Sequence, residues 1–183
     1  TRPAIEAAGV PESLGYNGRG YGVGTLHRPA NVDDSAQLAA LVDCLEDIQR
    51  RLPIVFPVHP RTAGRLQETG LATRLESAGI RLVEPMPYVR FMSLVAGAKA
   101  VVTDSGGVQE ETTYLGIPCF TLRESTERPI TVTEGTNRLA TADTVVAMLE
   151  GALNGHRPHR RRPDLWDGCT AERCVEDLRR RPR

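Results

Sequence analysis

Short apolar runs alternate with amphipathic stretches along most of this chain. The apolar runs are rich in valine, isoleucine and leucine and end at polar or proline-containing segments, as buried strands do. The amphipathic stretches repeat apolar residues at steps of three and four, which predicts helices with one buried face. The pattern predicts strands at 21–27, 54–58, 80–83, 99–103, 117–122 and 137–140. It predicts helices at 38–48, 61–77, 88–98, 106–115, 126–134, 142–153 and 170–179.

Strands and helices that alternate in this way predict an α/β fold. Parallel strands need crossover connections, and the helices in those connections cover both faces of the sheet. We therefore expect a doubly wound parallel sheet, Rossmann-like, over residues 21–155. Residues 1–20 are rich in glycine and proline and are expected to be a connector, and residues 156–183 to be a basic loop with a closing helix.

Polar motifs follow the ends of successive predicted strands. In a parallel sheet the carboxyl ends of the strands lie at one edge, and ligands bind beyond that edge. We therefore expect one binding site there. Its candidate side chains are His27 and Arg28 after the first strand, His59 after the second, Ser105 after the fourth, and Glu127 and Arg128 beyond the fifth.

The stretch 101–115 carries the most informative of these motifs. A strand that turns through Gly106 and Gly107 into a helix leaves free N–H groups at the helix start, where an anion is favoured. Glycine lacks the Cβ that would hold a phosphate away. Ser105 can donate a further hydrogen bond, and Glu111 lies one turn in, where a carboxylate can accept from a ribose hydroxyl. An ordinary strand-to-helix turn with Ser105 as its N-cap is the alternative.

The histidines and the arginine at the first two strand ends have two interpretations each. His27 and His59 can donate to a phosphate or carry a proton, and Arg28 can bind a phosphate through two parallel hydrogen bonds. Each side chain can equally be an ordinary residue at a strand end whose polar atoms form hydrogen bonds with water. The sequence alone leaves both interpretations open.

Phe91, Arg128 and Asp104 also have structural alternatives. Phe91 can stack on a base, although its spacing favours packing in the core. Arg128 can stabilise negative charge on a leaving diphosphate, or simply pair with Glu127 at a helix start. Asp104 is expected to face backbone amides, and no pair of acids stands out as a general acid and base.

Composition argues against several classes of partner. The chain has 23 basic and 23 acidic side chains, so no net charge draws it to nucleic acid or membranes. No apolar stretch is long enough to span a bilayer. The four cysteines lack zinc-site spacing, so no metal is expected, and Cys44 and Cys119 are expected to be buried. We expect a cytoplasmic protein with reduced thiols and, because the chain begins at Thr1, a piece of a longer one.

Several motifs together resemble the UDP-N-acetylglucosamine 2-epimerase family. They occur in order over nearly the whole chain, and the third and fourth are specific to the family, whereas other UDP-sugar enzymes of the glycosyltransferase type B fold share a looser version. The motifs are 25–29 (TLHRP), 57–62 (PVHPRT), 103–111 (TDSGGVQEE), and 126–129 (TERP) with 135–137 (GTN).

The resemblance covers only the C-terminal domain of that family. Its members have two Rossmann-like domains of the glycosyltransferase type B fold, with the active site between them. It implies that residues 21–155 are the UDP-binding domain, that residues 1–20 are an interdomain connector, and that the closing helix crosses back to the missing N-terminal domain.

Residue roles follow from the resemblance position by position. Ser105, Gly106 and Gly107 would hold the diphosphate, Glu111 would bind the ribose hydroxyls, and Phe91 would lie by the uracil.

His27 and Arg128 match the positions that contact the diphosphate and assist its departure, and Glu127 precedes Arg128 in the substrate-binding TERP motif. Arg28 and His59 match positions that bind a second, activating UDP-N-acetylglucosamine in non-hydrolysing members.

The family reaction removes the sugar C2 proton, eliminates UDP and adds it back with C2 inverted, without a cofactor or metal. The carboxylates that move this proton belong to the first domain, so this chain alone is expected to bind UDP weakly and turn over nothing. A homodimer is implied for the full-length protein. A hydrolysing epimerase that releases N-acetylmannosamine, a UDP-sugar glycosyltransferase domain and a non-catalytic UDP-binding module are the alternatives. Ala30 and Ile130 stand where the family pattern has glutamate.

Overall fold

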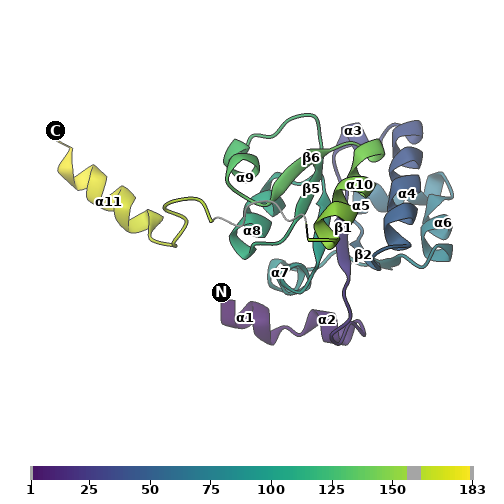
Figure 1. The fold of residues 1–183 in the computed structure, drawn as a ribbon, viewed down its shortest axis with the longest axis horizontal. Helices are drawn as coiled ribbons and strands as arrows, with labels where there is room; N and C mark the ends of the chain where they lie inside the picture. Colours follow the sequence, from purple (N-terminus) through teal and green to yellow (C-terminus); the bar gives the residue numbers. More distant parts are fainter. Residues whose placement is uncertain (1, 156–161, 182–183) are drawn as a thin grey trace.

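The computed structural model describes residues 2–155 and 162–181, and Figure 1 shows its elements. Within these residues, parallel strands form a six-stranded sheet in the order β3-β2-β1-β4-β5-β6. The strands are β1 (Gly22–Thr25), β2 (Ile54–Pro57), β3 (Arg81–Val83), β4 (Ala100–Thr103), β5 (Cys119–Leu122) and β6 (Asn137–Ala140). The predicted doubly wound parallel sheet is confirmed.

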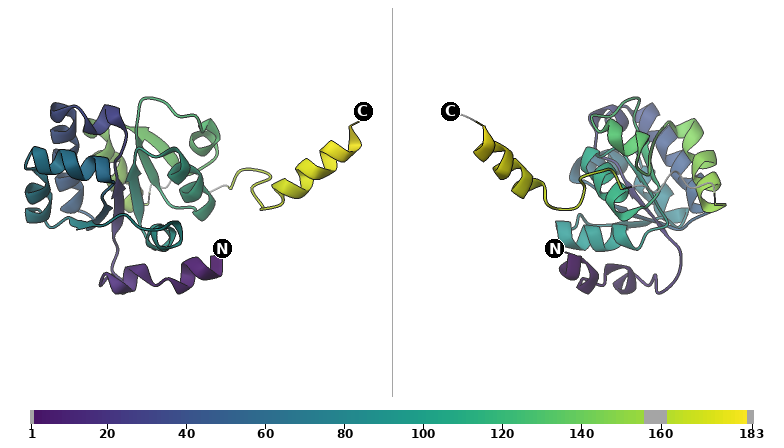
Figure 2. Two further views of the ribbon diagram at one scale, coloured as in Figure 1. Left: turned by 180° about the vertical axis from the view of Figure 1, so that it is seen from behind. Right: turned by 60° about the vertical axis from the view of Figure 1, so that its left-hand side comes forward.

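Helices cover both faces of this sheet (Figures 1 and 2). On one face lie α4 (Ser35–Gln49), α5 (Pro60–Glu68), α6 (Leu71–Ser77) and α10 (Ala142–Leu153). On the other lie α7 (Tyr88–Ala96) and α8 (Gly106–Leu115), with α1 (Arg2–Ala7) and α2 (Val10–Ser13) packed outside α7. The remaining helices are α3 (Pro29–Val32), α9 (Pro129–Thr133) and α11 (Thr170–Arg180).

The central strands are mostly apolar because both of their faces are buried. Ile54 and Phe56 of β2 point into the core cluster under α4, whereas Val55 between them points into the cluster under α7. Val102 and Val101 of β4 divide between the two clusters in the same way. Successive side chains of a strand face opposite sides, so a strand covered on both faces has a nearly continuous run of apolar residues.

The strand order reverses between β1 and β4, and this point of the sheet positions the site. From β1 the chain runs outward through β2 and β3, then returns to β4 on the other side of β1. In this register Thr25 lies opposite Thr103, so the two strands end level with each other. The segments that follow them, which carry His27 and Ser105, therefore lie side by side at a topological switch point, where such sheets bind ligands.

The predicted single helix over 61–77 is wrong, because the chain forms α5 and α6 with a break between them. Gly70 has a φ of 71° and caps the start of α6 from the left-handed region. Glycine adopts this conformation without the Cβ penalty of other residues, so the chain can turn there and start a second helix.

Residues 2–20 contain α1 and α2, which the sequence pattern did not reveal. Val10 is fully buried, and its backbone N–H donates to Ser93 Oγ of α7 at 3.4 Å. This segment is thus attached to the domain, and its assignment as an interdomain connector stays a prediction.

The C-terminal segment differs from the rest of the chain in its packing. The predicted helix over 170–179 is confirmed as α11, which extends away from the sheet (Figure 1) and has no buried residue. Residues 156–161 of the predicted basic loop lie outside the described residues. Among the described helices, none is long and apolar enough to cross a membrane.

Candidate functional site

The turn from β4 into α8 has the geometry of an anion cradle. Ser105 occupies the N-cap position with an extended backbone (φ −80°, ψ 133°), as expected, but its side chain makes no capping hydrogen bond. Its backbone N–H donates to Thr103 Oγ1 at 3.0 Å. The N–H groups of Gly106 and Gly107 stand in the first turn, where a helix supplies no acceptor. The hydroxyl and these N–H groups can therefore bind the same anion.

Gly106 and Gly107 are not explained by the chain's own packing. Neither has the positive φ that favours glycine. A Cβ at Gly106 would meet only Glu127 Oε2, at 4.0 Å, and a Cβ at Gly107 would meet nothing within 4 Å. Because neither backbone angle nor internal contact requires glycine here, the open space suits close approach of a ligand to the backbone.

Asp104 holds the end of β1 against the cradle. It is fully buried, and its carboxylate accepts hydrogen bonds from the backbone N–H groups of His27, at 3.0 and 3.1 Å, and Arg28, at 2.9 Å. Asn31 Nδ2 donates to it at 3.1 Å and also to the Leu122 carbonyl oxygen of β5. The expectation that Asp104 faces backbone amides is confirmed, and the role of Asn31 was not foreseen.

Burial alone would raise the pKa of Asp104, but the hydrogen bonds from His27, Arg28 and Asn31 outweigh burial and lower it. A carboxyl with a lowered pKa in the folded chain stabilises the fold above its ordinary pKa of 3.8 and loses this contribution as the pH falls further. We expect urea unfolding to show a fall in stability below about pH 4 that is smaller in Asp104→Asn. An unchanged acid dependence in the variant would contradict this assignment.

A cluster of guanidinium groups stands beside the cradle around Glu127. Arg123 donates to both oxygens of this carboxylate, at 2.7 and 2.8 Å, and Arg28 approaches it at 3.4 Å. The hydrogen bonds from Arg123 lower the pKa of Glu127 to about 2. Since Glu127 Oε2 is also the atom nearest to Gly106, these arginines already surround one anionic group next to the cradle.

Arg128 faces α8, not Glu127. Its Nε lies 3.0 Å from Glu110 Oε1, so the predicted alternative of a pair with Glu127 is wrong. The neighbouring Glu111 is half-buried, which raises its pKa, while a hydrogen bond from Tyr88 acts in the opposite direction. Arg128 therefore contacts α8 at the residue that precedes Glu111.

A buried polar network joins the cradle to the segment before α9, and sequence reasoning missed it. Gln109 is fully buried, and its Nε2 donates to the Ser105 carbonyl oxygen at 3.1 Å. Its Oε1 accepts from Thr126 Oγ1 at 2.6 Å and from Asn137 Nδ2 at 3.0 Å. Gln109 belongs to the quoted motif, and its position one helical turn after Ser105 was the available signal. The network fixes the TERP segment relative to the glycine turn.

His27 and His59 come together from β1 and β2. Their ring centroids are 5.7 Å apart. His59 Nδ1 accepts the backbone N–H of Arg61 at 3.2 Å and so caps α5, which leaves Nε2 as the other polar atom of its ring. The two imidazoles therefore lie next to each other at the carboxyl edge of the sheet, on the side of the cradle toward β2.

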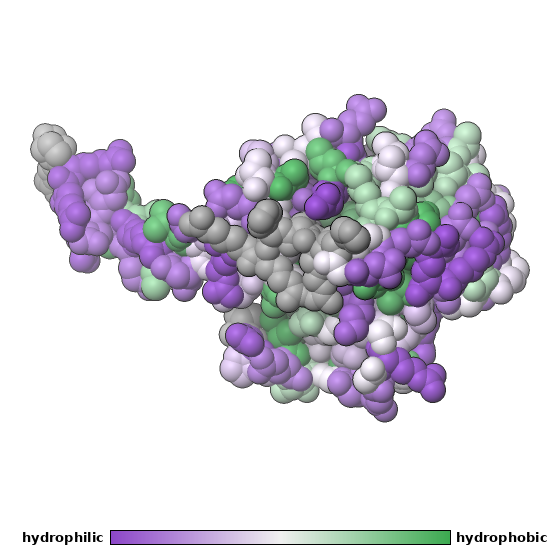
Figure 3. Space-filling view, in the orientation of Figure 1, coloured by the Kyte–Doolittle hydropathy of each residue, from purple (hydrophilic) through white to green (hydrophobic). Residues whose placement is uncertain are grey.

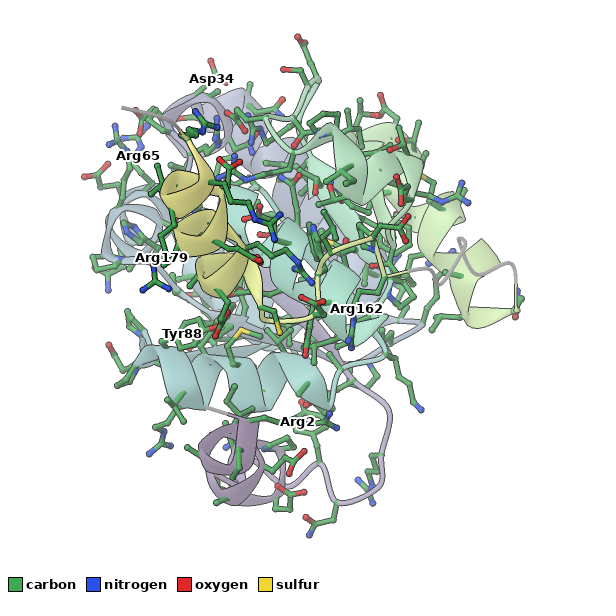
Figure 4. All side chains as sticks on the ribbon, turned by 90° about the vertical axis from the view of Figure 1, so that its left-hand side faces the viewer. Arg2, Asp34, Arg65, Tyr88, Arg162 and Arg179 are labelled. Atoms are coloured by element: carbon green, nitrogen blue, oxygen red, sulfur yellow. The ribbon has the colours of Figure 1, made fainter. Side chains whose placement is uncertain are left out.

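A hollow lies beside the cradle, between α1, α7, α8 and the segment that precedes α11. Its volume is about 1030 Å³. Tyr88 and Glu111 line it together with Trp166, and Figure 4 labels Arg2, Tyr88 and Arg162, which contribute from separate segments. Phe91 does not line it and packs, partly buried, against the core under α7. The hollow reaches the carboxylates of α8 but not the glycines.

The described residues contain no group of three or more histidine, cysteine, aspartate or glutamate side chains that could hold a metal ion. Cys44 and Cys119 are buried, as predicted, whereas Cys169 and Cys174 are exposed, and all are free thiols.

Comparison with known proteins decides the family. A family model described as UDP-N-acetylglucosamine 2-epimerase matches residues 2–179. The chain belongs to the UDP-N-acetylglucosamine 2-epimerase family. An epimerase of this name from Methanococcus maripaludis is 41% identical over 138 residues, which are 73% of this chain and 38% of that protein. A UDP-2,3-diacetamido-2,3-dideoxy-D-glucuronate 2-epimerase from Pseudomonas aeruginosa is 40% identical over 137 residues, 73% of this chain and 37% of that protein.

A solved epimerase structure agrees with the family assignment. The crystal structure of Methanocaldococcus jannaschii UDP-GlcNAc 2-epimerase, in complex with UDP-GlcNAc and UDP, matches with a TM-score of 0.78 at 33% identity. The match covers 96% of this chain and 52% of that chain. This epimerase-family chain therefore spans less than half of the curated relatives and about half of the solved one.

Within the epimerase family, the predicted site residues of this chain fall into two groups. Contacts connect one group along one edge of the sheet: His59 with His27, His27 and Arg28 with Asp104 before Ser105, and Arg28 with Glu127, whose carboxylate borders the open space at Gly106. Phe91 and Glu111 belong to the neighbouring side, around the hollow and α7. The individual binding roles assigned to these residues stay predictions.

Proposed function

We propose that this chain is the nucleotide-binding part of a UDP-N-acetylglucosamine 2-epimerase, which converts UDP-N-acetylglucosamine to UDP-N-acetylmannosamine by elimination and re-addition of UDP. The observation that carries the proposal is the open pair of glycines at a helix start, beside a cluster of guanidinium groups at the switch point. Backbone N–H groups and arginine side chains are the donors that a diphosphate requires.

Each part of the site has a role in this proposal. Ser105, Gly106 and Gly107 bind the diphosphate through the hydroxyl and N–H groups of the cradle. Glu111, on the wall of the hollow, accepts from the ribose hydroxyls, so that the nucleoside extends from the cradle along α8. Phe91 lies near the base on the α7 side.

His27 and Arg128 provide positive or hydrogen-bonding groups for the departing diphosphate. Charge grows on the phosphate oxygens as the sugar–oxygen bond breaks, and donors placed beforehand stabilise it. Arg28 and His59 stand farther along the same edge, where a second sugar nucleotide can bind. Glu127 contributes to the substrate site from between the arginines.

We expect this chain alone to bind UDP weakly and to produce no epimer, because a phosphate cradle without a base cannot ionise the sugar C2. We infer from the family resemblance that this base belongs to the missing N-terminal domain. Calorimetry measures UDP binding, and proton NMR of UDP-N-acetylglucosamine follows the C2 epimer. The full-length protein is the positive control. Epimer formed by the chain alone would contradict this part of the proposal.

The 40% identity to a UDP-2,3-diacetamido-2,3-dideoxy-D-glucuronate 2-epimerase favours a second candidate substrate. Incubating the full-length protein with either sugar nucleotide compares the two directly. The same assay identifies the products. Release of free N-acetylmannosamine with UDP indicates the hydrolysing route, and transfer to an added acceptor indicates a glycosyltransferase.

We infer that α11 packs against the missing N-terminal domain. Val175 and Leu178 lie at helical spacing and are 47% and 67% exposed, while Arg180 and Arg181 pair with acidic residues of the same helix. Figure 3 shows mainly hydrophilic colour on the visible face of α11. The start of α1 lies on the side from which α11 extends (Figure 2), so both ends of the chain are placed to meet one preceding domain. Residues 2–20 then form the connector.

Assembly and location complete the proposal. We infer a homodimer of the full-length protein, which light scattering tests. We infer a cytoplasmic location because the cysteines are free thiols, as expected in a reducing compartment.

A further inference from the structure

A direct side-chain contact in the site joins His27 to the buried Asp104. His27 Nδ1 lies 2.8 Å from Asp104 Oδ1. The Asp104 side chain is 0% exposed, whereas the His27 side chain is 37% exposed. One edge of the imidazole is therefore fixed inside the protein, and the opposite edge faces the outside, where the substrate site lies.

Asp104 determines which nitrogen of this ring carries a proton. An ionised carboxylate has only acceptors, so the Nδ1 that contacts it must donate. The remaining partners of Asp104 are also donors, from the backbone of His27 and Arg28 and from Asn31. They lower its pKa despite burial and so keep it ionised at neutral pH. His27 then has its proton on Nδ1, and Nε2 is left for other contacts.

We propose that Asp104 is a positioning residue that fixes the tautomer and orientation of His27, so that Nε2 is presented to the leaving diphosphate. This inference rests on the proposed epimerase function. Asp104 itself has no contact with the ligand in this arrangement. It contacts the ring at Nδ1, and the same carboxylate accepts hydrogen bonds from the backbone of His27 and Arg28, just after β1.

The chemical consequence concerns charge at Nε2. A ring with Nδ1–H and a free Nε2 can take up one proton and become an imidazolium that donates at both nitrogens. A donor at Nε2 then meets the charge that grows on the diphosphate as UDP leaves. A ring with the other tautomer would turn a lone pair toward Asp104 and lose the contact.

Nitrogen-15 NMR of the histidine rings in this chain tests the inference without turnover. We expect His27, assigned by the signal lost in His27→Asn, to be the Nδ1–H tautomer when neutral. The same measurement on Asp104→Asn is expected to show the Nε2–H tautomer or a mixture, because the amide can donate to Nδ1. An Nε2–H tautomer in the unmodified chain overturns the proposal, whether or not the variant folds.

Kinetics of the full-length protein gives a second readout, with Asn31→Ala as the matched control. Asn31→Ala removes a donor to Asp104 but leaves the carboxylate beside Nδ1. We expect Asp104→Asn to lower kcat by about 100-fold with a much smaller change in KM. The control is expected to lower the melting temperature while keeping the Nδ1–H tautomer and most of kcat. Equal losses of kcat in both variants would show that Asp104 acts only through stability.

The two proposals can fail separately. If the unmodified full-length protein forms no epimer, the proposed function fails, while the tautomer of His27 still decides the role of Asp104. If the protein epimerises normally and His27 has its proton on Nε2, the inference about Asp104 fails alone.

Discussion

Replacing Gly106 with alanine is expected to weaken UDP binding about 10- to 100-fold while leaving the chain folded. The added methyl group enters space in which the chain has only Glu127 Oε2, at 4.0 Å, so no internal clash follows. It does obstruct a phosphate oxygen that approaches the N–H groups of the first turn. A lost hydrogen bond to a charged group costs about 1.5–3 kcal/mol, which sets the expected factor. Gly106→Val should weaken binding further.

The matched control is Gly64→Ala in α5. Gly64 is also helical and an added Cβ there would meet nothing within 4 Å, but it lies away from the cradle. Both variants exchange a helical glycine for alanine and should therefore keep or raise the melting temperature. Calorimetry should find the UDP affinity reduced in Gly106→Ala alone. Unchanged affinity in a folded Gly106→Ala protein would show that the diphosphate binds elsewhere.

The arrangement of the sheet could be predicted from sequence because its signals are local. Both faces of β2 and β4 are buried, so their apolar runs are continuous, and the helices between strands keep one apolar stripe. The break at Gly70 was missed because the apolar pattern continues across it, from Leu66 in α5 to Leu75 in α6. Only the backbone angle of Gly70 reveals the turn. The helices within residues 2–20 are too short to show a period.

The location of the site could also be predicted, because carboxyl ends of parallel strands share one edge. Which side chains pair could not. Sequence proximity suggested a pair with Glu127 as the structural alternative for Arg128, but the helix start at Pro129 leaves Arg128 facing Glu110, a contact that depends on how α8 and α9 pack. The contact between His27 and Asp104 joins residues far apart in the chain and follows from the register of β1 and β4.

The roles of the buried side-chain amides were the hardest to predict from the sequence, although these amides hold the site together. Gln109 lies in a recognised motif and Asn31 follows two residues after another, but their types alone do not show whether they face a ligand or the protein interior. The structure shows that Asn31 joins Asp104 to β5 and that Gln109 joins Ser105 to the segment before α9. These two amides therefore support the residues around the cradle through hydrogen bonds within the protein.

Replacing Gln109 with leucine is expected to destabilise the chain by about 2–5 kcal/mol, since each partner left unsatisfied costs about 1–3 kcal/mol. Leucine fills a similar volume, so the loss reflects hydrogen bonds and not a cavity. The Ser105 carbonyl oxygen and Thr126 Oγ1 lose a partner, whereas Asn137 Nδ2 keeps its contact with Thr131 Oγ1 at 3.1 Å. For a chain of this size the melting temperature should fall by about 5–15 °C.

The control is Gln67→Leu on the exposed surface of α5, which should leave the melting temperature nearly unchanged because its side chain is solvated. UDP affinity should fall in Gln109→Leu below the melting transition, since the TERP segment with Arg128 is no longer fixed to the glycine turn. The two measurements separate the effects of the network. A less stable protein with full UDP affinity would mean that Gln109 supports the fold but does not position the binding residues.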